Sequence, residues 1–426
     1  MSRFFKSPWP WVYIPTLYFA EGLPYVMVND ASVVAYKGMG VSNELIGLTS
    51  LLYLPWVIKP LWGPVVDLTG TKRSWILATQ ALMAIGFFLV ALSFGTGFFF
   101  ATSLAFLILI AFASATHDIA ADGFYLLALD KQKQAFYVGI RSTFYRLAAI
   151  TGAGLLVALA GYWMNQGISP AESWKYVFLL VCGLFLLLAF FHWIYLPKPA
   201  ADSQREKSSL KEMGKGFLDA FACYFRQKDI GIIVAFILLF RLGEAMLVKM
   251  ISPFLMDQSG AGGLGFDTEQ VGIINGTYGT IGLLVGGILG GILIARFGLR
   301  KCLWPMVGAI HLPNLAYIYM ATALPDIGIA GVFVVLEKFG YGFGFTAFLV
   351  ILMRSVDERF KTSHFAISTG FMAMGMMLPG MVSGYLQASL GYAWFFTMVC
   401  LATIPGMLTI FFLPLRRFDE EQKEVV

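Results

Sequence analysis

FFFATSLAFLILIAFA (residues 98–113) runs directly into SATHDIAAD (residues 114–122), and this junction is the most informative stretch of the sequence about the fold. The first part is apolar enough to lie inside a lipid bilayer, where an ionised side chain costs about 2.5–3.5 kcal/mol even on lenient scales. Asp118 and Asp122 are four residues apart, so on a helix they share one face, with His117 roughly 100° around the axis. Because that face cannot point at lipid, the stretch predicts a membrane helix packed against other protein or water.

The composition also indicates an integral membrane protein. Of 426 residues, 58% are hydrophobic and only 13% are charged, with 39 Phe, 45 Gly and a net charge of +5. No water-soluble core could absorb that much apolar surface. The four cysteines (Cys182, Cys223, Cys302 and Cys400) are scattered without metal-binding spacing, and no Walker motif or nucleophile elbow occurs. We therefore expect no enzyme activity, no metal site and no cofactor.

Membrane spans need about 20 mostly apolar residues, and the chain offers twelve candidates. They are 10–36, 44–67, 74–94, 98–127, 135–163, 174–197, 230–256, 268–295, 301–323, 327–353, 363–388 and 392–414. The sequence therefore predicts an all-α membrane protein with a six-helix bundle in 1–197, a cytoplasmic linker in 198–229 and a second six-helix bundle in 230–426. Within the linker, Leu210 to Phe225 has the apolar spacing of a surface helix.

Lys and Arg side chains are distributed unevenly between the two sets of loops. Almost all of them lie in the termini, the linker and every second loop, and only Lys37 and Lys175 fall in the opposite loops. By the positive-inside rule this bias predicts that both termini are cytoplasmic. Lys37 and Lys175 are interpreted as solvated surface residues.

Two short loops repeat each other in the two halves of the chain. The first reads GPVVDLTGTKR (residues 63–73) and the second GILIARFGLRK (residues 291–301), with both glycines and both cations at matching positions. This six-plus-six repeat resembles the major facilitator superfamily, whose loop signature is G-x-x-x-D-R-x-G-R-R/K. The first copy has Leu68 in place of Arg, and the second has Ala295 in place of the acid. The resemblance implies a cytoplasmic gate formed by Asp67, Lys72, Arg73, Arg296 and Arg300. Arg141, within a turn or two of a predicted cytoplasmic loop, is a further candidate for the gate.

Within the predicted spans lie six acids and six bases. They are Glu21, Asp30, Asp118, Asp122, Glu244 and Glu337, and Lys59, Arg141, Arg146, Arg241, Lys249 and Lys338. Unpaired, each would cost about 2.5–3.5 kcal/mol, so they must form ion pairs that hold helices together or line a hydrated cavity. Glu21 and Asp30, nine residues apart, are expected on opposite helix faces, with Asp30 at the outer mouth.

A carboxyl that changes its protonation near working pH is what a proton-coupled carrier needs. Two carboxylates on one helical turn repel each other and favour retention of a proton. The proton-coupling candidates are Asp118, Asp122, Glu21, Glu244 and Glu337. For His117 two interpretations stay open, a proton relay at the binding site and a satisfied packing residue.

Several strings, in order along nearly the whole chain, resemble the AmpG-type muropeptide permeases, a branch that includes peptide and acetyl-CoA transporters. They include FAEGLP (residues 19–24), KPLW (59–62), SATHDIAAD (114–122), YRL (145–147), LGEA (242–245) and VGIIN (271–275). The resemblance implies proton-coupled import of anhydro-muropeptides across the bacterial inner membrane. It also implies basic partners for the acidic groups of the solute, rings that stack on its sugar, and His117 beside them. The basic partners are Lys59, Arg146 and Arg241, and the rings are those of Tyr145, Trp62 and Phe19.

Other functions remain compatible with the sequence. The chain departs from the permease pattern after Asp122, where Phe124, Tyr125, Leu126 and Leu127 replace an expected Lys and acid. Alternatives are an importer of another sugar acid or peptide, an efflux pump for drugs or siderophores, and a non-transporting receptor. We expect a monomer in the lipid bilayer whose partners are a small solute and protons, and no nucleic acid.

Overall fold

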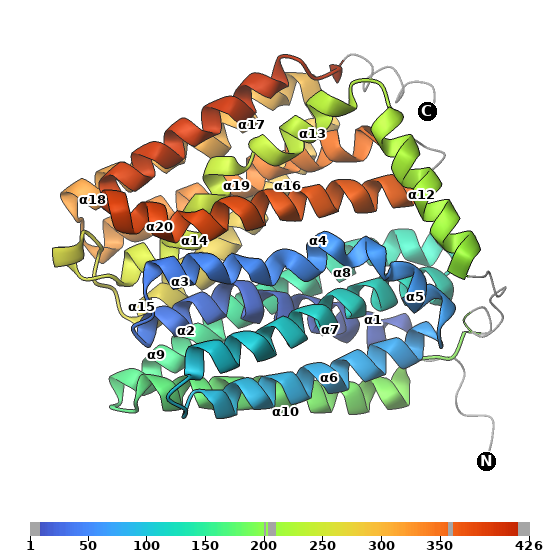
Figure 1. Ribbon diagram of the computed structural model, residues 1–426, viewed down its shortest axis with the longest axis horizontal. Helices are drawn as coiled ribbons and strands as arrows, with labels where there is room; N and C mark the ends of the chain where they lie inside the picture. Colours follow the sequence, from blue (N-terminus) through green and yellow to red (C-terminus); the bar gives the residue numbers. More distant parts are fainter. Residues whose placement is uncertain (1–8, 200–201, 203–209, 357–360, 416–426) are drawn as a thin grey trace.

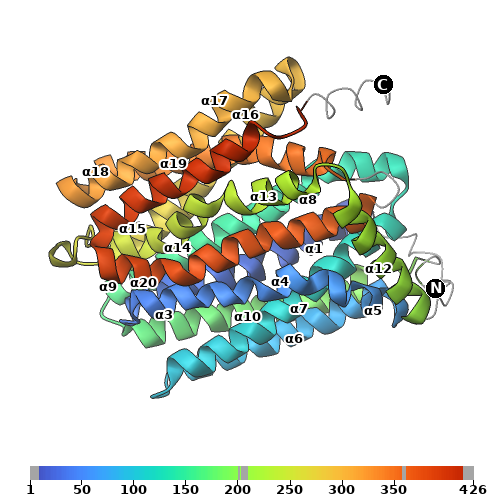
Figure 2. The ribbon, with the colours of Figure 1, turned by 45° about the horizontal axis from the view of Figure 1, so that its top comes forward.

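The structure is a computed structural model that describes residues 9–199, 202, 210–356 and 361–415. These residues form helices and connecting turns without a β-strand among them, which confirms the predicted all-α class. Figures 1 and 2 show the long helices lying side by side as a bundle. The ends of the chain, residues 200–201 and 203–209 of the predicted linker, and residues 357–360 lie outside the described residues, so the predicted location of the termini stays a prediction.

The helices that precede the linker are here called the N-terminal group. They are α1 (Pro10–Val26), η1 (Met27–Ala31), α2 (Ser32–Gly38), α3 (Asn43–Leu48), η2 (Thr49–Tyr53), α4 (Leu54–Ile58), η3 (Lys59–Leu61), α5 (Gly63–Leu68), α6 (Lys72–Ser93), α7 (Phe99–Ala128), α8 (Lys131–Ala149), η4 (Ile150–Leu156), α9 (Val157–Asn165) and α10 (Pro170–Tyr195).

The helices that follow it are the C-terminal group. They are α13 (Ile230–Leu239), α14 (Leu242–Met256), η5 (Ser259–Ala261), α15 (Thr268–Val271), η6 (Gly272–Tyr278), α16 (Gly279–Phe297), α17 (Leu299–His311), η7 (Leu312–Asn314), α18 (Leu315–Ala323), α19 (Ile327–Arg354) and α20 (Lys361–Ile410). Between the groups, α12 (Leu210–Arg226) covers the stretch for which a surface helix is predicted.

Eight helices in the described residues are long and apolar enough to cross a membrane. They are Lys72–Ser93, Phe99–Ala128, Lys131–Asn165, Pro170–Tyr195, Ile230–Met256, Thr268–Phe297, Ile327–Arg354 and Ser363–Ile410. The last contains two of the predicted spans, which are joined through a kink at Gly391 with φ 72°. The predicted spans 10–36, 44–67 and 301–323 are helical but interrupted by π or 3₁₀ turns. The protein is therefore a multi-pass membrane protein, and twelve crossings remain the prediction.

The N-terminal and C-terminal groups lie side by side, and α12 runs beside both at one end of the bundle (Figures 1 and 2). Two seams join the groups: α3 and η2 pack against α20, and η4 with α9 packs against η6 with α15. Glycines make both seams possible. A Cβ on Gly384 would lie 1.8 Å from the Asn43 carbonyl oxygen, and a Cβ on Gly276 would lie 1.8 Å from that of Ala153.

Candidate functional site

A cavity of about 620 Å³ lies between the two groups of helices. Its wall comes from α1, η1, α8 and η4 on one side and from α14, η6, α16, α19 and α20 on the other. The volume falls within the range of about 300–1,000 Å³ that small-molecule sites occupy. The charged side chains of the wall are two acids and four bases, namely Glu21, Asp30, Arg141, Arg146, Arg241 and Lys338. The excess of bases favours a solute that carries negative charge.

Arg146 and Arg241 reach this cavity from opposite groups of helices. Nη1 of Arg146 and Nε of Arg241 are buried and have no hydrogen-bond partner within the described chain. The Arg146 guanidinium lies against Gly287 of α16, where a Cβ would be 3.5 Å from Nη1. The Arg241 guanidinium donates a hydrogen bond to the Tyr341 hydroxyl and lies 4.6 Å from the Phe345 ring centroid. Two guanidinium groups with free donors are suited to bind carboxylates or phosphates.

Aromatic and amide side chains complete the wall. Tyr145, predicted as a stacking residue, lines the cavity together with Tyr25. Asn29 and Asn275 also line it, and the Oδ1 atom of each is buried without a partner in the described residues. Sequence reasoning did not assign these two amides, because an uncharged side chain in an apolar helix gives a weak signal. For Asn275, the available sequence signal was an amide side chain within a glycine-containing apolar stretch, which the structure shows to be the π turn η6.

Glu21 and Asp30 both border the cavity, which corrects the expectation that they face opposite sides. The reason is the π-helical turn η1 (Met27–Ala31), which contains Asp30 and widens the helix just after Glu21. A π turn holds more residues than an α turn, so it changes the angular phase of everything that follows. Glu21 is 9% exposed, and its Oε2 has no hydrogen-bond partner among the described residues.

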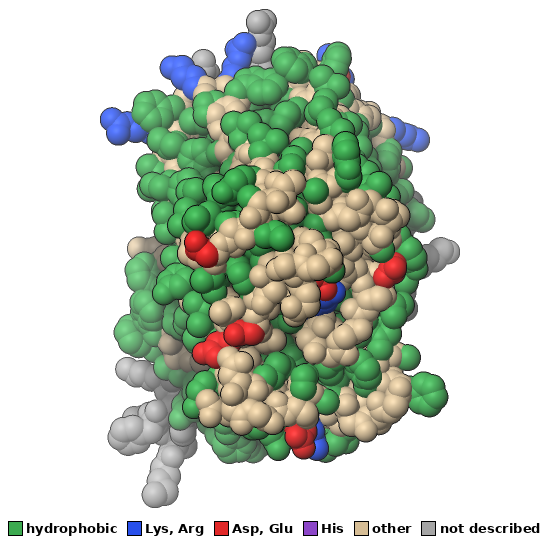
Figure 3. Space-filling view, turned by 90° about the vertical axis from the view of Figure 1, so that its left-hand side faces the viewer, with side chains coloured by type: hydrophobic (Ala, Val, Ile, Leu, Met, Phe, Trp, Pro, Cys, Tyr) green, Lys and Arg blue, Asp and Glu red, His purple; other side chains and the backbone are tan. Residues whose placement is uncertain are grey.

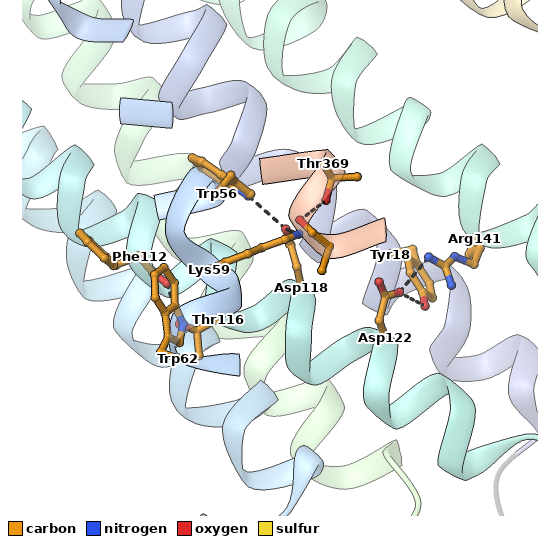
Figure 4. Close-up of polar contacts among 11 residues, drawn as sticks. Tyr18, Trp56, Lys59, Trp62, Phe112, Thr116, Asp118, Asp122, Arg141 and Thr369 are labelled. Atoms are coloured by element: carbon orange, nitrogen blue, oxygen red, sulfur yellow. Dashed lines mark hydrogen bonds and ion pairs between the residues drawn. The ribbon is translucent and has the colours of Figure 1, made fainter. Parts of the chain in front are cut away.

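Asp118 and Asp122 each have a basic partner, as Figure 4 shows. Oδ2 of Asp118 accepts a hydrogen bond of 3.1 Å from Nε1 of Trp56 and lies 3.9 Å from Nζ of Lys59. Oδ1 of Asp122 lies 2.8 Å from Nη2 of Arg141 and accepts a 3.0 Å hydrogen bond from the Tyr18 hydroxyl. Both carboxylates are therefore satisfied in this conformation, and neither lines the cavity.

The remaining predicted binding residues lie outside the cavity wall. Phe19 packs against the hydrophobic core. Trp62 donates a 3.1 Å hydrogen bond to Thr116 and lies against Phe112 (Figure 4). His117 is fully buried, and its Nε2 lies 3.0 Å from Nε2 of Gln80. Lys59, Trp62 and His117 therefore lie on or beside the Asp118 turn of α7 rather than at the large cavity.

Glu244 and Glu337 belong to a buried cluster of polar side chains in the C-terminal group, together with His311, Asn314 and Tyr317, and this cluster is called the pocket below. The side chains of Glu244 and Glu337 are fully buried and do not line the large cavity. Nδ2 of Asn314 donates a 2.6 Å hydrogen bond to Glu244, and Nδ1 of His311 lies 3.3 Å from the same carboxylate oxygen. The Tyr317 hydroxyl donates a 3.4 Å hydrogen bond to Glu337.

The residues predicted to form the cytoplasmic gate lie in different parts of the structure. Nζ of Lys72 lies 2.5 Å from Oδ1 of Asp67, and Nε of Arg73 donates a 3.1 Å hydrogen bond to the Leu196 carbonyl. These contacts stay within the N-terminal group. Arg296 and Arg300 lie at the junction of α16 and α17, and both are exposed. Arg141 lines the cavity instead.

At the end of the bundle opposite α12, a polar network ties the two groups together. Nζ of Lys37 lies 2.5 Å from Oδ1 of Asp257, and Nδ2 of Asn43 donates hydrogen bonds of 3.1, 2.6 and 3.0 Å to Asp257, Gln387 and Tyr392. The prediction that Lys37 is a solvated surface residue was wrong, because its side chain is only 13% exposed and ion-paired. Figure 3 views the molecule from this end, where a basic and an acidic side chain lie together near the centre.

Comparison with known proteins agrees with this architecture. The sequence model of the Major Facilitator Superfamily matches residues 14–367. The chain is 28% identical to the anhydromuropeptide permease of Escherichia coli strain K12 over 418 residues, which cover 96% of this chain and 80% of the permease. Its fold is similar to solved structures of the nucleoside transporter NupG (TM-score 0.69, 18% identity, 93% and 97% covered) and a D-xylose-proton symporter (TM-score 0.69, 13% identity, 95% and 97% covered).

A cavity with charged residues in its wall, enclosed by membrane helices, together with these similarities defines a membrane transporter rather than an enzyme. Within that class, the chain belongs to the Major Facilitator Superfamily.

Proposed function

We propose that this protein imports anhydromuropeptides, or closely similar acidic sugar-peptides, from periplasm to cytoplasm with protons as the coupling ion. The observation that carries the proposal is the pair of buried guanidinium groups, Arg146 and Arg241, whose free donors face one cavity from the two groups of helices. A solute with a carboxylate would satisfy them. The tyrosines of the wall, Tyr145 and Tyr25, supply flat surfaces for a sugar ring.

The cavity lies between the two groups of helices, which is the position that an alternating-access mechanism needs. In the proposal, residues 1–197 and 230–426 rock against each other around the solute, and the network of Lys37 and Asp257 closes the periplasmic end in the conformation described. The protein acts as a monomer in the bacterial inner membrane, with both termini in the cytoplasm. Each proton that enters with the solute contributes about 2.3 kcal/mol per 100 mV of membrane potential.

The test is uptake of a radiolabelled anhydromuropeptide into proteoliposomes with an imposed inside-alkaline gradient. Wild-type protein should accumulate the solute only with the gradient. Arg146→Gln and Arg241→Gln should each reduce uptake by roughly tenfold to a hundredfold, since a hydrogen bond to a charged group contributes about 1.5–3 kcal/mol. Arg226→Gln is the matched control, because Arg226 is exposed at the end of α12 and should leave uptake unchanged.

The same vesicles separate the alternatives. Binding of the radiolabelled probe without uptake or exchange would indicate a receptor. Gradient-driven extrusion of a drug or siderophore, with no muropeptide uptake, would indicate an efflux pump. Uptake that is unchanged in both arginine variants would contradict the proposed site even if the solute is correct.

A further inference from the structure

The pocket around Glu244 and Glu337 contains more carboxylate than its cations can balance. Glu244 and Glu337 are both 0% exposed, and one oxygen of each, Oε2 of Glu244 and Oε1 of Glu337, has no hydrogen-bond partner in the described residues. Nε2 of His311 and Oδ1 of Asn314 are likewise buried without a partner there. Four unpaired polar atoms in one buried pocket are unusual, since buried polar groups are normally satisfied.

Only one permanent cation of the described chain lies within ion-pair distance of this pocket. Nζ of Lys338 is 3.8 Å from Oε2 of Glu337, and the His311 ring beside Glu244 carries charge only when protonated. Two ionised carboxylates facing one ammonium group away from water are strongly unfavourable. The pocket is therefore most stable when it holds a proton. In contrast, Asp118 and Asp122 of the N-terminal group each have a basic partner.

Lys338 connects this pocket to the solute cavity. Glu337 and Lys338 are adjacent on α19, so their side chains diverge by about 100°. Glu337 faces the pocket, whereas Lys338 lines the large cavity between the groups. The 3.8 Å separation of their charged atoms lets one ammonium group serve either the Glu337 carboxylate or an acidic solute.

We propose that Glu337, with Glu244 in the same pocket, binds the proton that drives transport, and that Lys338 couples this proton to the solute. This inference rests on the proposed function and names the group that carries its proton. When Glu337 is ionised, it holds the Lys338 ammonium. When Glu337 is protonated, Lys338 is released to the cavity and binds the carboxylate of the solute. By linkage, a bound anionic solute makes the pocket hold its proton more tightly to the same degree.

Other titratable groups face the pocket from the surrounding helices. They are His311 on α17, Tyr317 on α18, Tyr341 on α19 and Cys400 on α20, each in contact or electrostatic interaction with Glu244 or Glu337. None of these side chains adds a permanent positive charge. Lys338 also interacts electrostatically with Asp30 of η1, which lines the same cavity. Glu337, Asp30 and an acidic solute therefore share this ammonium group, and protonation of Glu337 removes one of these three partners.

Two transport modes in proteoliposomes test the proton site. Gradient-driven uptake of a radiolabelled anhydromuropeptide needs proton movement, whereas exchange against an excess of unlabelled probe does not. Glu337→Gln mimics the protonated carboxyl, so exchange should remain within about twofold of wild type while gradient-driven accumulation falls by at least an order of magnitude. Asp118→Asn should alter both modes in parallel, because it disturbs a satisfied ion pair rather than the proton site.

The outcomes distinguish this inference from the proposed function. If wild type shows neither uptake nor exchange, the proposed function fails. If wild type accumulates the probe and folded Glu337→Gln accumulates it equally well, the function stands and the proton site is wrong. The site is also wrong if Asp118→Asn, and not Glu337→Gln, keeps exchange while losing accumulation.

Equilibrium binding of the same probe to detergent-solubilised protein tests the role of Lys338. Wild-type affinity should fall on the order of tenfold when the pH rises enough to ionise Glu337, because the Glu337 carboxylate then holds Lys338. Glu337→Gln should bind tightly at every pH, and Lys338→Gln weakly at every pH. A Lys338→Gln variant that keeps the wild-type pH dependence would overturn the coupling role.

Discussion

His117 and His192 are buried histidines that one glutamine links, and Nδ1 of His117 has no hydrogen-bond partner among the described residues. Nε2 of Gln80 lies 3.0 Å from His117, and Oε1 of Gln80 lies 3.0 Å from Nδ1 of His192. Nε2 of His192 in turn lies 3.0 Å from the Thr16 hydroxyl. Both histidine rings are fully buried, and none of the four residues lines the cavity. This chain of hydrogen bonds favours packing as the role of His117 over a proton relay.

Replacing Gln80 tests that role. Gln80→Leu removes the partners of two ring nitrogens, and at about 1–3 kcal/mol for each unsatisfied group it should destabilise the protein by about 2–6 kcal/mol. Chemical unfolding in detergent measures this loss. Uptake per folded molecule should stay at the wild-type level. Gln166→Leu, at an exposed position after α9, serves as the control and should not change stability. Normal stability with lost gradient-driven uptake would instead support a relay.

At the scale of helices, the π turns η4 and η6 bring the two groups into backbone contact. Their packing depends on Gly276 and Gly154, since a Cβ on Gly276 would lie 2.6 Å from the Gly154 Cα as well as 1.8 Å from the Ala153 oxygen. Backbone atoms cannot move aside as a flexible side chain can. The seam therefore has to open before any larger residue fits.

Gly276→Ala should consequently weaken this seam and lower both thermal stability and uptake, the latter by roughly tenfold if the lost packing amounts to about 1–3 kcal/mol. Gly183→Ala on α10 is the comparison, because a Cβ there meets no atom within 4 Å. Melting curves and uptake at equal membrane abundance measure the two effects. Equal behaviour of the two variants would mean that the seam is looser than described.

For the whole molecule, the conformation depends on the network at the end opposite α12. Asp257 accepts from both Asn43 and the Tyr392 hydroxyl, the latter at 2.6 Å, in addition to its ion pair with Lys37. These contacts join the two groups at the end that the Lys and Arg bias predicts to be periplasmic. Loss of the Asp257 charge leaves the partly buried Lys37 ammonium without its ion-pair partner.

Asp257→Asn should therefore shift the population toward a state that is open at this end. Ser252, which lines the cavity and is 7% exposed, provides a reporter position after replacement by Cys. Its labelling by a membrane-impermeant thiol reagent from the periplasmic side should accelerate on the order of tenfold for a shift of about 1.4 kcal/mol. Glu172→Gln, in the exposed first turn of α10, should leave the labelling rate unchanged. Unaltered labelling in Asp257→Asn would contradict the role of the Asp257 network in holding this end closed.

The sequence was sufficient to predict a helical, multi-pass membrane protein, and it identified the acids and bases that lie within the apolar spans. Long apolar runs suffice for this, because backbone groups in lipid must be hydrogen-bonded within helices. It also pointed to Arg146, Arg241, Tyr145 and Glu21, which line the cavity. Charged or aromatic side chains in an apolar helix stand out without any knowledge of their neighbours.

Only the tertiary structure decided which of these residues share a site. The π turn η1 brings Asp30 to the same cavity as Glu21. Contacts between the successive helices α7 and α8 pair Asp122 with Arg141, and a contact between the two groups of helices pairs Lys37 with Asp257. Helix rotation and the packing of the two groups determine these partners. Neither quantity is contained in the local pattern of apolar and charged residues, because both depend on how the surfaces of different helices fit together.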